Sequence, residues 1–369
     1  MSNLKRVLIA GLTSETGGME SYVMNLYRHI NREHVQFDFV NHLSSTSIAF
    51  SDEILELGGK IYNVPMVRHD LFEHYRALDE LFNNNDYQAL YYQANRRVKN
   101  VDLFRYAKKH KIPHRILHSH NSMELGENII NRTRAEIAEK NLKKYVTDCW
   151  ACSVDAGKWM FSDKDNVVVV NNGVDTNVFD FDSSIAESVR NQEQTGKKLV
   201  FGTVGRMCRQ KNSLFLIDIF ADIHKQRPET VFWHIGGGEM ESAMRQRVEK
   251  LGLVDSYRFL GRKNNVSDYL KAMDVLLLPS EYEGFPITLV EAQCSGLKCL
   301  VSNTITESVD ITGNVSFKSI QDSSLTWADA ALQLSDYNRQ SCKDILKNKG
   351  YDEQSIADWF ESFIMSDVQ

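Results

Sequence analysis

Short apolar runs alternate along the chain with longer segments of helical periodicity. The runs predict buried strands, and apolar residues that recur every three or four positions between them predict amphipathic helices. Strand and helix in regular alternation indicate a parallel sheet joined by crossover helices. The predicted strands are 6–11, 35–40, 89–93, 116–120, 167–170, 199–204, 231–235, 258–261, 275–278 and 298–302. The predicted helices begin at residue 17 or cover 71–83, 101–111, 213–224 and 239–251.

The strand and helix pattern occurs twice, with a segment rich in turn formers between the two occurrences. Asn-Asn-Gly-Val-Asp at 171–175 follows the strand at 167–170, and a new series of strands begins at residue 199. A chain of 369 residues also exceeds one ordinary core. We therefore predict two doubly wound α/β domains, residues 1–171 and 172–350, with a hinge at 171–175.

The end of the chain carries an apolar stripe. Its members recur at the spacing of one helix face: Ile356, Trp359, Phe360, Phe363 and Ile364. A helix of this kind has to cover an apolar surface, so we expect residues 351–369 to pack back across the N-terminal domain.

Two glutamates lie where the apolar run 275–278 ends. Glu283 and Glu291 bracket a Gly-Phe-Pro turn. Pro286 suits the first position of a helix, because its missing N–H would have no intrahelical partner there. A helix start attracts phosphate, and the main-chain N–H groups available for it would be those of Phe285, Ile287 and Thr288.

Carboxylates beside an anion site make sense when they accept hydrogen bonds from sugar hydroxyls. A helix start for phosphate, with a carboxylate on each side for sugars, indicates a nucleotide sugar. The alternative is that Glu283 is a solvated loop residue and Glu291 an exposed helix residue, and this segment alone leaves both open.

A second glycine-rich helix start follows the first strand. The polar loop 12–16 leads into Gly17 and Gly18, which is the opening of a Rossmann-like domain. The dinucleotide fingerprint is absent, because the spacing from Gly11 to Gly17 is too long.

Composition is that of a soluble globular protein. No apolar run approaches the roughly 18 to 20 residues of a membrane span, and the first residues predict a strand rather than a cleavable signal. We expect a cytoplasmic protein. The six cysteines are scattered, and the pair Cys149 and Cys152 has no second pair nearby, so reduced thiols and no structural zinc are expected.

Basic residues are concentrated in 96–115. Arg96, Arg97, Lys99, Arg105, Lys108, Lys109, Lys111 and Arg115 are accompanied there only by Asp102. Such a segment can hold a protein at anionic lipid, with about 1 kcal/mol per close charge. A solvated helix face explains it equally well. Nucleic acid is not an expected partner, because the net charge is −6 and no aromatic binding motif accompanies the segment.

Five motifs, in this order, resemble the retaining glycosyltransferases of family 4, whose GT-B fold has two Rossmann-like domains facing a central cleft. They are Gly17-Gly18-Met19-Glu20, Asn172-Gly173-Val174-Asp175, Gly205-Arg206 with Lys211-Asn212, Gly236–Glu239, and Glu283 with Glu291. Together they cover almost the whole chain. His118-Ser119-His120-Asn121 is similar to the branch that makes bacterial capsule and exopolysaccharide.

The resemblance implies a role for each motif residue in binding a nucleotide sugar, most often a UDP-sugar. Glu283 would accept hydrogen bonds from the donor sugar, and Glu291 from the ribose diol. Arg206 and Lys211 would hold the diphosphate, although the short Gly-Arg-x4-Lys-Asn spacing makes the lysine contact the weaker inference. The remaining donor-site residues implied are Gly205, Arg262, Gly284, Phe285, Pro286 and Ile287.

In the other domain, the resemblance places Gly17 and Gly18 near the donor phosphate or the acceptor. It places His120 near the reacting centre, with a buried structural histidine as the alternative. We expect His118 to point to the opposite face of its strand and therefore favour His120.

No cofactor or metal is expected. The sequence offers no Asp-x-Asp in a plausible site, because 163–165 and 180–182 fall in predicted surface turns. Retention of configuration follows from the resemblance alone, as does an acceptor that is a glycan or a lipid-linked glycan. Two alternatives remain: a sugar-nucleotide epimerase or hydrolase of the same fold, and a non-catalytic partner subunit of a transferase.

Overall fold

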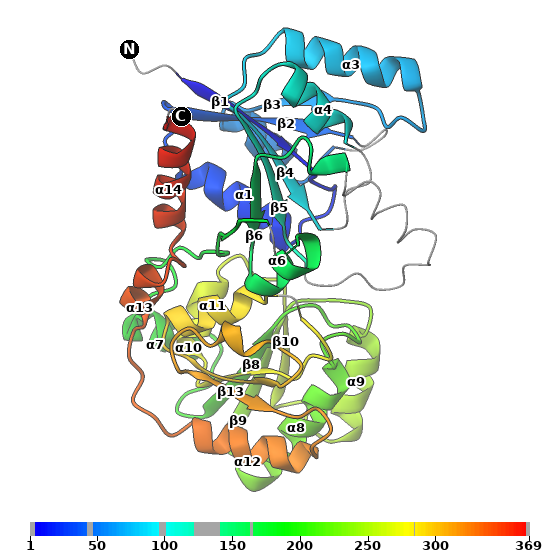
Figure 1. Ribbon diagram of the computed structural model, residues 1–369. Coiled ribbons are helices and arrows are strands. Elements are labelled where there is room, and N and C mark those ends of the chain that lie inside the picture. Colours follow the sequence, from blue (N-terminus) through cyan, green and yellow to red (C-terminus); the bar gives the residue numbers. More distant parts are fainter. Residues whose placement is uncertain are drawn as a thin grey trace. The chain divides into compact units, whose positions relative to one another are not determined.

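The computed structural model describes residues 4–42, 47–95, 101–121, 141–162, 165–283 and 285–366. The chain forms two units, Met1–Gly173 with Glu353–Gln369 and Val174–Asp352. We call them the N-terminal and C-terminal domains (Figure 1). The chain leaves the N-terminal domain after Gly173 and returns to it at Glu353, two residues beyond each boundary that the sequence predicted.

The N-terminal domain is built on a parallel sheet in the strand order β3-β2-β1-β4-β5-β6-β7. Its strands are β1 (Lys5–Ala10), β2 (Val35–Asn41), β3 (Lys60–Asn63), β4 (Ala89–Ala94), β5 (His114–Ser119), β6 (Asp148–Ala151) and β7 (Val167–Val169). Its helices are α1 (Gly18–His29), α2 (Ser51–Glu56), α3 (Leu71–Asn83), α4 (Asp102–Lys109), α6 (Val154–Met160) and α14 (Glu353–Met365).

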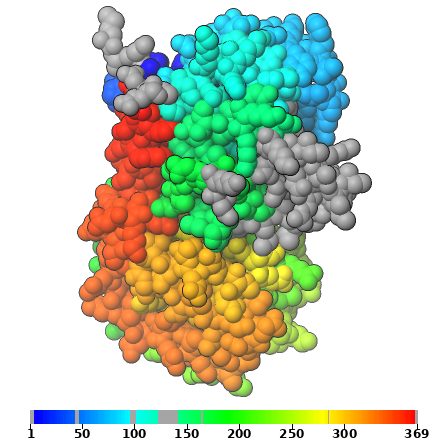
Figure 2. Space-filling view, in the orientation of Figure 1, coloured from blue at the N-terminus to red at the C-terminus, as the bar shows by residue number. Residues whose placement is uncertain are grey.

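Successive residues of β1 pack in two separate cores, because side chains alternate between the faces of a strand. Val7 and Ile9 pack with α1 and α14, whereas Leu8 and Ala10 pack with α3 and α4. The apolar stripe at the end of the chain is the inner face of α14. Its Phe360 is fully buried, with its ring 5.7 Å from Phe37. Figure 2 shows the carboxyl-terminal residues, in red, lying against the N-terminal domain.

The C-terminal domain is built on a second parallel sheet, in the order β10-β9-β8-β11-β12-β13. Its strands are β8 (Leu199–Val204), β9 (Thr230–Ile235), β10 (Tyr257–Gly261), β11 (Val275–Leu278), β12 (Lys298–Ser302) and β13 (Val315–Lys318). Its helices are α7 (Ser183–Gln192), α8 (Ser213–Gln226), α9 (Glu241–Lys250), α10 (Val266–Ala272), α11 (Ile287–Cys294), α12 (Ser324–Leu334) and α13 (Lys343–Asn348), with a 3-10 turn at Glu307–Val309.

Each sheet has one point at which the chain reverses the direction in which it adds strands. That point lies between β1 and β4 in the first sheet and between β8 and β11 in the second. The helices that follow these two strands pack on opposite faces, so a crevice opens at their carboxyl ends, where open α/β sheets bind ligands. The glycine-rich helix start at Gly17 follows β1, and the Glu283 loop follows β11.

The doubly wound α/β fold predicted from the sequence is confirmed, and every predicted strand is present. Three strands were not predicted: β3, β6 and β13. They are short and mix charged or polar residues with apolar ones, and β3 and β13 are edge strands. Such strands bury only part of their surface, so they lack the continuous apolar run of a central strand.

The six cysteines are free thiols, and all but Cys149 are buried. Burial raises the pKa of Cys152 to about 11 and that of Cys294 to about 12. These thiols are therefore protonated at neutral pH. Among the helices of the described residues, none is both long and apolar enough to cross a membrane.

We expect Phe360→Ala to lower the free energy of unfolding by about 3–5 kcal/mol, because it leaves a cavity where α14 meets the N-terminal core. Urea titration followed by circular dichroism measures the change. The matched control is Phe72→Ala, since Phe72 is 80% exposed on α3. Its effect should stay within about 0.5 kcal/mol. Equal losses in both variants would mean that α14 does not contribute to this core in solution.

Candidate functional site

Main chain packs directly against main chain at the carboxyl ends of β8 and β9. Gly236 has a φ of +136°, and a Cβ on it would lie 1.9 Å from the carbonyl oxygen of Gly205. A Cβ on Gly238 would lie 2.4 Å from the carbonyl oxygen of Met207. Only glycine permits this approach, which forms the floor of the crevice. Lys211 lies across the floor, because its Cε would be 3.4 Å from a Cβ on Gly205.

An ion pair crosses the crevice between the loops that follow β8 and β11. The Nζ of Lys211 is 2.5 Å from Oε1 of Glu283, and the two side chains are 21% and 8% exposed. The hydroxyl of Ser280 donates to the same carboxylate oxygen at 2.6 Å. Glu283 is therefore a fixed, largely buried carboxylate, and the alternative of a solvated loop residue was wrong.

Hydrogen bonds between main-chain groups and a side-chain amide join the same two loops. The N–H of Glu281 donates to the carbonyl of Gln210 at 2.8 Å, and Nε2 of Gln210 donates to the carbonyl of Tyr282 at 3.1 Å. These contacts hold the Lys211 loop and the Glu283 loop in one arrangement.

Helix α11 begins directly after the Glu283 loop. Pro286 is its N-cap, with φ −72° and ψ 107°, and not the first helical residue as the sequence predicted. The Pro286 carbonyl accepts from the N–H of Leu289 at 3.0 Å, which a cap residue can do and which explains the one-residue difference. Among the described residues, the N–H groups of Ile287 and Thr288 have no hydrogen-bond partner. They are open to an anion.

The side chains at this helix start anchor it in the domain. Phe285 stacks on Tyr351 with ring centroids 6.0 Å apart, and Phe285 and Ile287 both pack against the cluster that contains Val290. The apolar side chains point into the protein, so the main chain is left for a ligand. Gly284, also implied by the resemblance, lies outside the described residues.

Glu291 lies one turn further along α11 and is partly buried. It has no hydrogen bond or ion pair to any described residue, and burial raises its pKa to about 7. It is not the exposed helix residue of the alternative interpretation. A carboxyl group with a pKa of about 7 is half protonated near neutral pH. A hydroxyl that donates a hydrogen bond to it stabilises its ionised form.

Two exposed arginines follow the ends of β8 and β10. Arg206 and Arg262 form no ion pair within the described part of the chain. Lys211 differs from them, because Glu283 already neutralises it. Of the cations that the resemblance assigned to the diphosphate, Arg206 is the one available without breaking an existing contact.

In the N-terminal domain, Gly17 is the N-cap of α1 and Gly18 its first residue. Both are exposed, and a Cβ on Gly18 would meet no atom within 4 Å. The buried Glu20 carboxylate lies at the same helix start, where it accepts from the N–H of Thr13 at 3.0 Å and from its hydroxyl at 2.8 Å. The positive end of α1 is therefore partly compensated before any ligand arrives.

His120 directly follows β5, at the same edge of the sheet as Gly17. Its Nε2 is 2.7 Å from Oε1 of Gln93, a buried residue of β4, and its Nδ1 has no partner among the residues that the structure describes. Burial lowers the pKa of His120 to about 3, so the imidazole is neutral. Sequence reasoning missed Gln93, because nothing in a strand sequence shows which neighbour lies beside it.

The predicted orientation of His118 was wrong. The rings of His118 and His120 are 4.1 Å apart, since residues two apart on a strand share a face. His118 is fully buried and its Nδ1 is 2.7 Å from the hydroxyl of Tyr91. It belongs to the core, and His120 is the one at the strand end.

The basic segment 96–115 is largely occupied by internal contacts where it is described. Arg105 pairs with Asp102 at 2.9 Å and Lys109 with Asp79 at 3.8 Å. The guanidinium of Arg115 donates to main-chain carbonyls, including that of Tyr145 at 2.5 Å. Three further members, Arg96, Arg97 and Lys99, lie outside the described residues.

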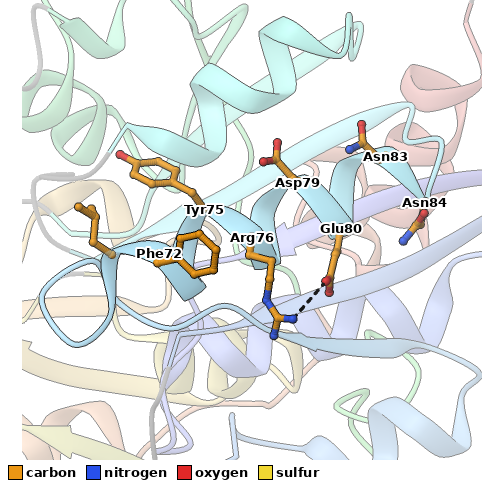
Figure 3. A pocket seen from close by; sticks show the side chains of 8 residues that line it. Phe72, Tyr75, Arg76, Asp79, Glu80, Asn83 and Asn84 are labelled. Carbon is orange, nitrogen blue, oxygen red and sulfur yellow. Dashed lines mark ion pairs between the residues drawn. The ribbon is translucent and has the colours of Figure 1, made fainter.

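A cavity of about 650 Å³ lies along α3 (Figure 3). It is lined by Leu71, Phe72, Tyr75, Arg76, Asp79, Glu80, Asn83 and Asn84. None of these residues belongs to the candidate site, and all of them come from one helix and its cap. The lining mixes apolar, basic and acidic groups without a converging set of polar atoms.

Within the described ranges, no three His, Cys, Asp or Glu side chains gather closely enough to hold a metal ion. Of the two Asp-x-Asp sequences, Asp182 caps α7 by accepting from the N–H of Ser184 at 2.8 Å. Asp165 pairs with Lys143 at 2.8 Å, and Asp163 is not among the described residues.

Comparison with known proteins identifies the fold around this crevice. Residues 184–331, which include β8, β11 and α11, match the family model for glycosyl transferases group 1. This part of the chain, which is most of the C-terminal domain, therefore has the sequence of a group 1 glycosyltransferase. The family resemblance drawn from the motifs is thereby confirmed.

Relatives of this glycosyltransferase extend the match beyond the C-terminal domain. It is 29% identical to EpsF of Bacillus subtilis (strain 168), over 96% of this chain and 94% of EpsF. It is 33% identical to the Escherichia coli UDP-Gal:alpha-D-GlcNAc-diphosphoundecaprenol alpha-1,3-galactosyltransferase, over 40% of this chain and 39% of that enzyme.

Solved structures show that the glycosyltransferase has the GT-B fold. Anabaena Alr3699/HepE, solved in complex with UDP, superposes with a TM-score of 0.76 at 15% identity, covering 98% of this chain and 99% of that one. A glycosyltransferase from Rickettsia africae ESF-5 superposes with a TM-score of 0.75 at 12% identity, covering 99% and 100%.

The raised pKa of Glu291 predicts a pH-dependent stability. The unfolded glutamate ionises near its usual pKa of about 4.3, whereas the folded one keeps its proton until about pH 7. Stability contributed by Glu291 is therefore complete below about pH 4 and is lost as the pH rises to about 7. Relative to Glu291→Gln, the free energy of unfolding of the wild type should fall by about 1–3 kcal/mol over this range, measured by urea titrations at several pH values.

The exposed Glu187 on α7 provides the control Glu187→Gln, which should follow the wild-type curve. If the Glu291→Gln and wild-type curves are parallel, Glu291 is ionised normally.

Proposed function

We propose that this glycosyltransferase transfers a hexosyl or N-acetylhexosaminyl unit from a UDP-sugar to a lipid-linked precursor of a cell-surface polysaccharide, with retention of configuration. The observation that carries the proposal is the set of groups at the β8/β11 crevice. An arginine with no ion pair to any described residue, two open main-chain N–H groups and two partly buried glutamates follow the carboxyl ends of the neighbouring strands β8 and β11. A nucleoside diphosphate sugar has a partner for each of them.

The diphosphate would take the positive groups. Arg206 offers a planar fork of donors for phosphate oxygens, and the start of α11 offers the N–H groups of Ile287 and Thr288. Negative charge grows on the leaving phosphate as the glycosidic bond breaks, so donors at this position stabilise the transition state more than the ground state. Lys211 would add charge while remaining close to Glu283. Arg262 and the glycine floor at Gly205 complete this part of the site.

The two glutamates would take the hydroxyl groups. Glu291, one helical turn behind the phosphate position, suits the ribose diol. Glu283 suits hydroxyls of the donor sugar, because its carboxylate is fixed by Lys211 and Ser280 at the loop that leads into α11. No resident metal is required in this arrangement, since arginine, lysine and the helix start supply the positive charge.

The N-terminal domain would bind the acceptor. A neutral His120 can orient an acceptor hydroxyl or shield the positively charged sugar, and the exposed Gly18 lets a ligand approach the main chain. By family resemblance the departing phosphate takes the acceptor proton, so no side chain is needed as a covalent nucleophile.

The names of the relatives support the substrate classes. The E. coli relative is named for UDP-Gal as donor and for a sugar linked to diphosphoundecaprenol as acceptor. CapH of Staphylococcus aureus, 26% identical over 78% of each chain, is named for capsular polysaccharide biosynthesis. We propose a cytoplasmic location at the inner face of the membrane for the same reason, since a lipid-linked acceptor is held there. The basic segment 96–115 would contribute only through the charges not already paired.

The proposed function is tested by incubating the protein with UDP-glucose, UDP-galactose or UDP-N-acetylglucosamine, each with and without a diphosphoundecaprenol-linked sugar. Mass spectrometry of the lipid fraction should show one added hexose or N-acetylhexosamine. A rapidly epimerised or hydrolysed sugar nucleotide in the absence of acceptor would favour an epimerase or hydrolase. Failure of UDP and of every UDP-sugar to raise the melting temperature would favour a non-catalytic partner subunit.

We expect Arg206→Ala to lower kcat by about two to three powers of ten, by analogy with the removal of one oxyanion donor. Arg209→Ala, in the same loop, is the matched control. Arg209 is 90% exposed and lies 3.7 Å from Glu281, so its removal should leave kcat nearly unchanged. Equal kcat values for wild type and Arg206→Ala would mean that the diphosphate binds elsewhere.

We expect Glu291→Gln to weaken UDP-sugar binding and to remove a pH dependence. In the wild type, affinity should rise as the pH increases through about 7, because the ionised carboxylate accepts from the ribose hydroxyls. The sugar-diphosphate linkage has no ionisation near this pH, so calorimetric titrations with a UDP-sugar report on the protein. A wild-type affinity that is flat between pH 6 and 8 would contradict the assignment of Glu291 to the ribose.

A further inference from the structure

A chain of hydrogen-bonded polar groups links three strand ends of the C-terminal sheet. Ser280, two residues after β11, has no exposed surface, and its hydroxyl donates to Oε1 of Glu283 at 2.6 Å. The same oxygen takes the ion pair from Lys211, which belongs to the loop after β8. The third strand end enters through Thr304, whose hydroxyl donates to the Ser280 carbonyl at 2.9 Å.

Thr304 is itself held in place. Its N–H donates to the hydroxyl of Ser302, the last residue of β12, at 3.1 Å, and the two hydroxyls are 2.6 Å apart. Ser302 is fully buried. The position of the Ser280 hydroxyl is therefore determined by β11 and β12 together and does not depend on a mobile loop side chain.

Both contacts to the Glu283 carboxylate fall on one oxygen. Oε1 accepts from Ser280 and pairs with Lys211, whereas Oε2 has no hydrogen bond to any described residue. An ionised carboxylate can accept about four hydrogen bonds through its two oxygens. Oε2 is therefore the oxygen that can accept further hydrogen bonds. The contacts to Oε1 restrict the side-chain torsions of Glu283 and so the position of Oε2.

We propose that Ser280 is a positioning residue for donor-sugar recognition: it holds the Glu283 carboxylate so that Oε2 accepts from a hydroxyl of the sugar, and Thr304 supports it. This inference rests on the proposed function, in which Glu283 contacts the donor sugar. Without Ser280, the carboxylate keeps its attraction to Lys211 but loses one of the two contacts that hold Oε1 in place. Ordering a free glutamate side chain costs conformational entropy, so a loose Glu283 should bind the sugar more weakly.

The test separates the sugar from the nucleotide. The UDP-sugar with the highest kcat/KM among UDP-glucose, UDP-galactose and UDP-N-acetylglucosamine is compared with UDP, which lacks the sugar. Ser280→Ala should lower kcat/KM for that UDP-sugar by about 10- to 100-fold, the range for a lost hydrogen bond to a charged group. The Kd for UDP, measured by calorimetry, should stay within about twofold, because no proposed UDP contact involves Glu283.

Two further variants distinguish positioning from general stability. Thr304→Val keeps the shape of an exposed residue and removes its hydrogen bond to Ser280, so it should act in the same direction with a smaller loss. Ser256→Ala removes another buried serine of this domain, whose hydroxyl donates only to the Leu253 carbonyl at 3.3 Å, and should leave both UDP-sugar turnover and UDP affinity unchanged. If Ser280→Ala also lowers the melting temperature, the result for Thr304→Val is used instead: a lower kcat/KM for the UDP-sugar supports positioning, and an unchanged value contradicts it.

Two outcomes overturn the inference while the proposed function survives. One is an active wild type whose kcat/KM is unaffected by Ser280→Ala and Thr304→Val. The other is an equal loss of UDP-sugar and UDP binding, which would mean that Ser280 supports the nucleotide site as a whole. If the wild type neither binds UDP nor turns over any UDP-sugar, the proposed function fails and the inference fails with it.

Discussion

Parallel pairing of β8 with β11 determines where the chemistry of the C-terminal domain can lie. All strands of a parallel sheet end at one edge, and the crossover helices of these two neighbours pack on opposite faces, so only here is the edge left open. Glycines let the main chains of the β8 and β9 loops come into direct contact beside this opening. The ion pair from Lys211 to Glu283 joins the loops that follow β8 and β11. The residues proposed to bind the donor all lie in the segments that follow the strands of this sheet.

The charges of the site resolve a difficulty in the proposed assignment, which puts two glutamates beside a bound diphosphate. Glu283 is neutralised by Lys211, and burial raises the pKa of Glu291, which has no hydrogen bond to any described residue, to about 7. Neither presents a full unbalanced negative charge. Arg206 and the start of α11 are not compensated by any described residue, so in the proposed assignment they are the positive groups left for the diphosphate, although the chain as a whole has a net charge of −6. The glutamates still have oxygens free to accept hydrogen bonds from hydroxyl groups.

The sequence predicted the fold well because its central strands are continuous apolar runs and its helix starts carry glycine or proline. It predicted the composition of the candidate site through motif order, but not its contacts. The pairing of Lys211 with Glu283 joins residues 72 positions apart and depends on the strand order. Gln93 beside His120 has the same origin, since neighbours across a sheet leave no local signal. The orientation of His118 could have been predicted, because the alternation of a strand already places it on the same face as His120.

Helix α14 gives the N-terminal domain an unusual dependence on the end of the chain. Ile356, Ala357, Phe360 and Ile364 form part of the same core as β1, β2 and β4, which the ribosome makes more than 250 residues earlier. Domains generally fold as units as they emerge during synthesis. Here the first domain to emerge must wait for its last helix until the second domain has been completed. During that interval the apolar side chains of β1, β2 and β4 that pack with α14 lack this part of their core.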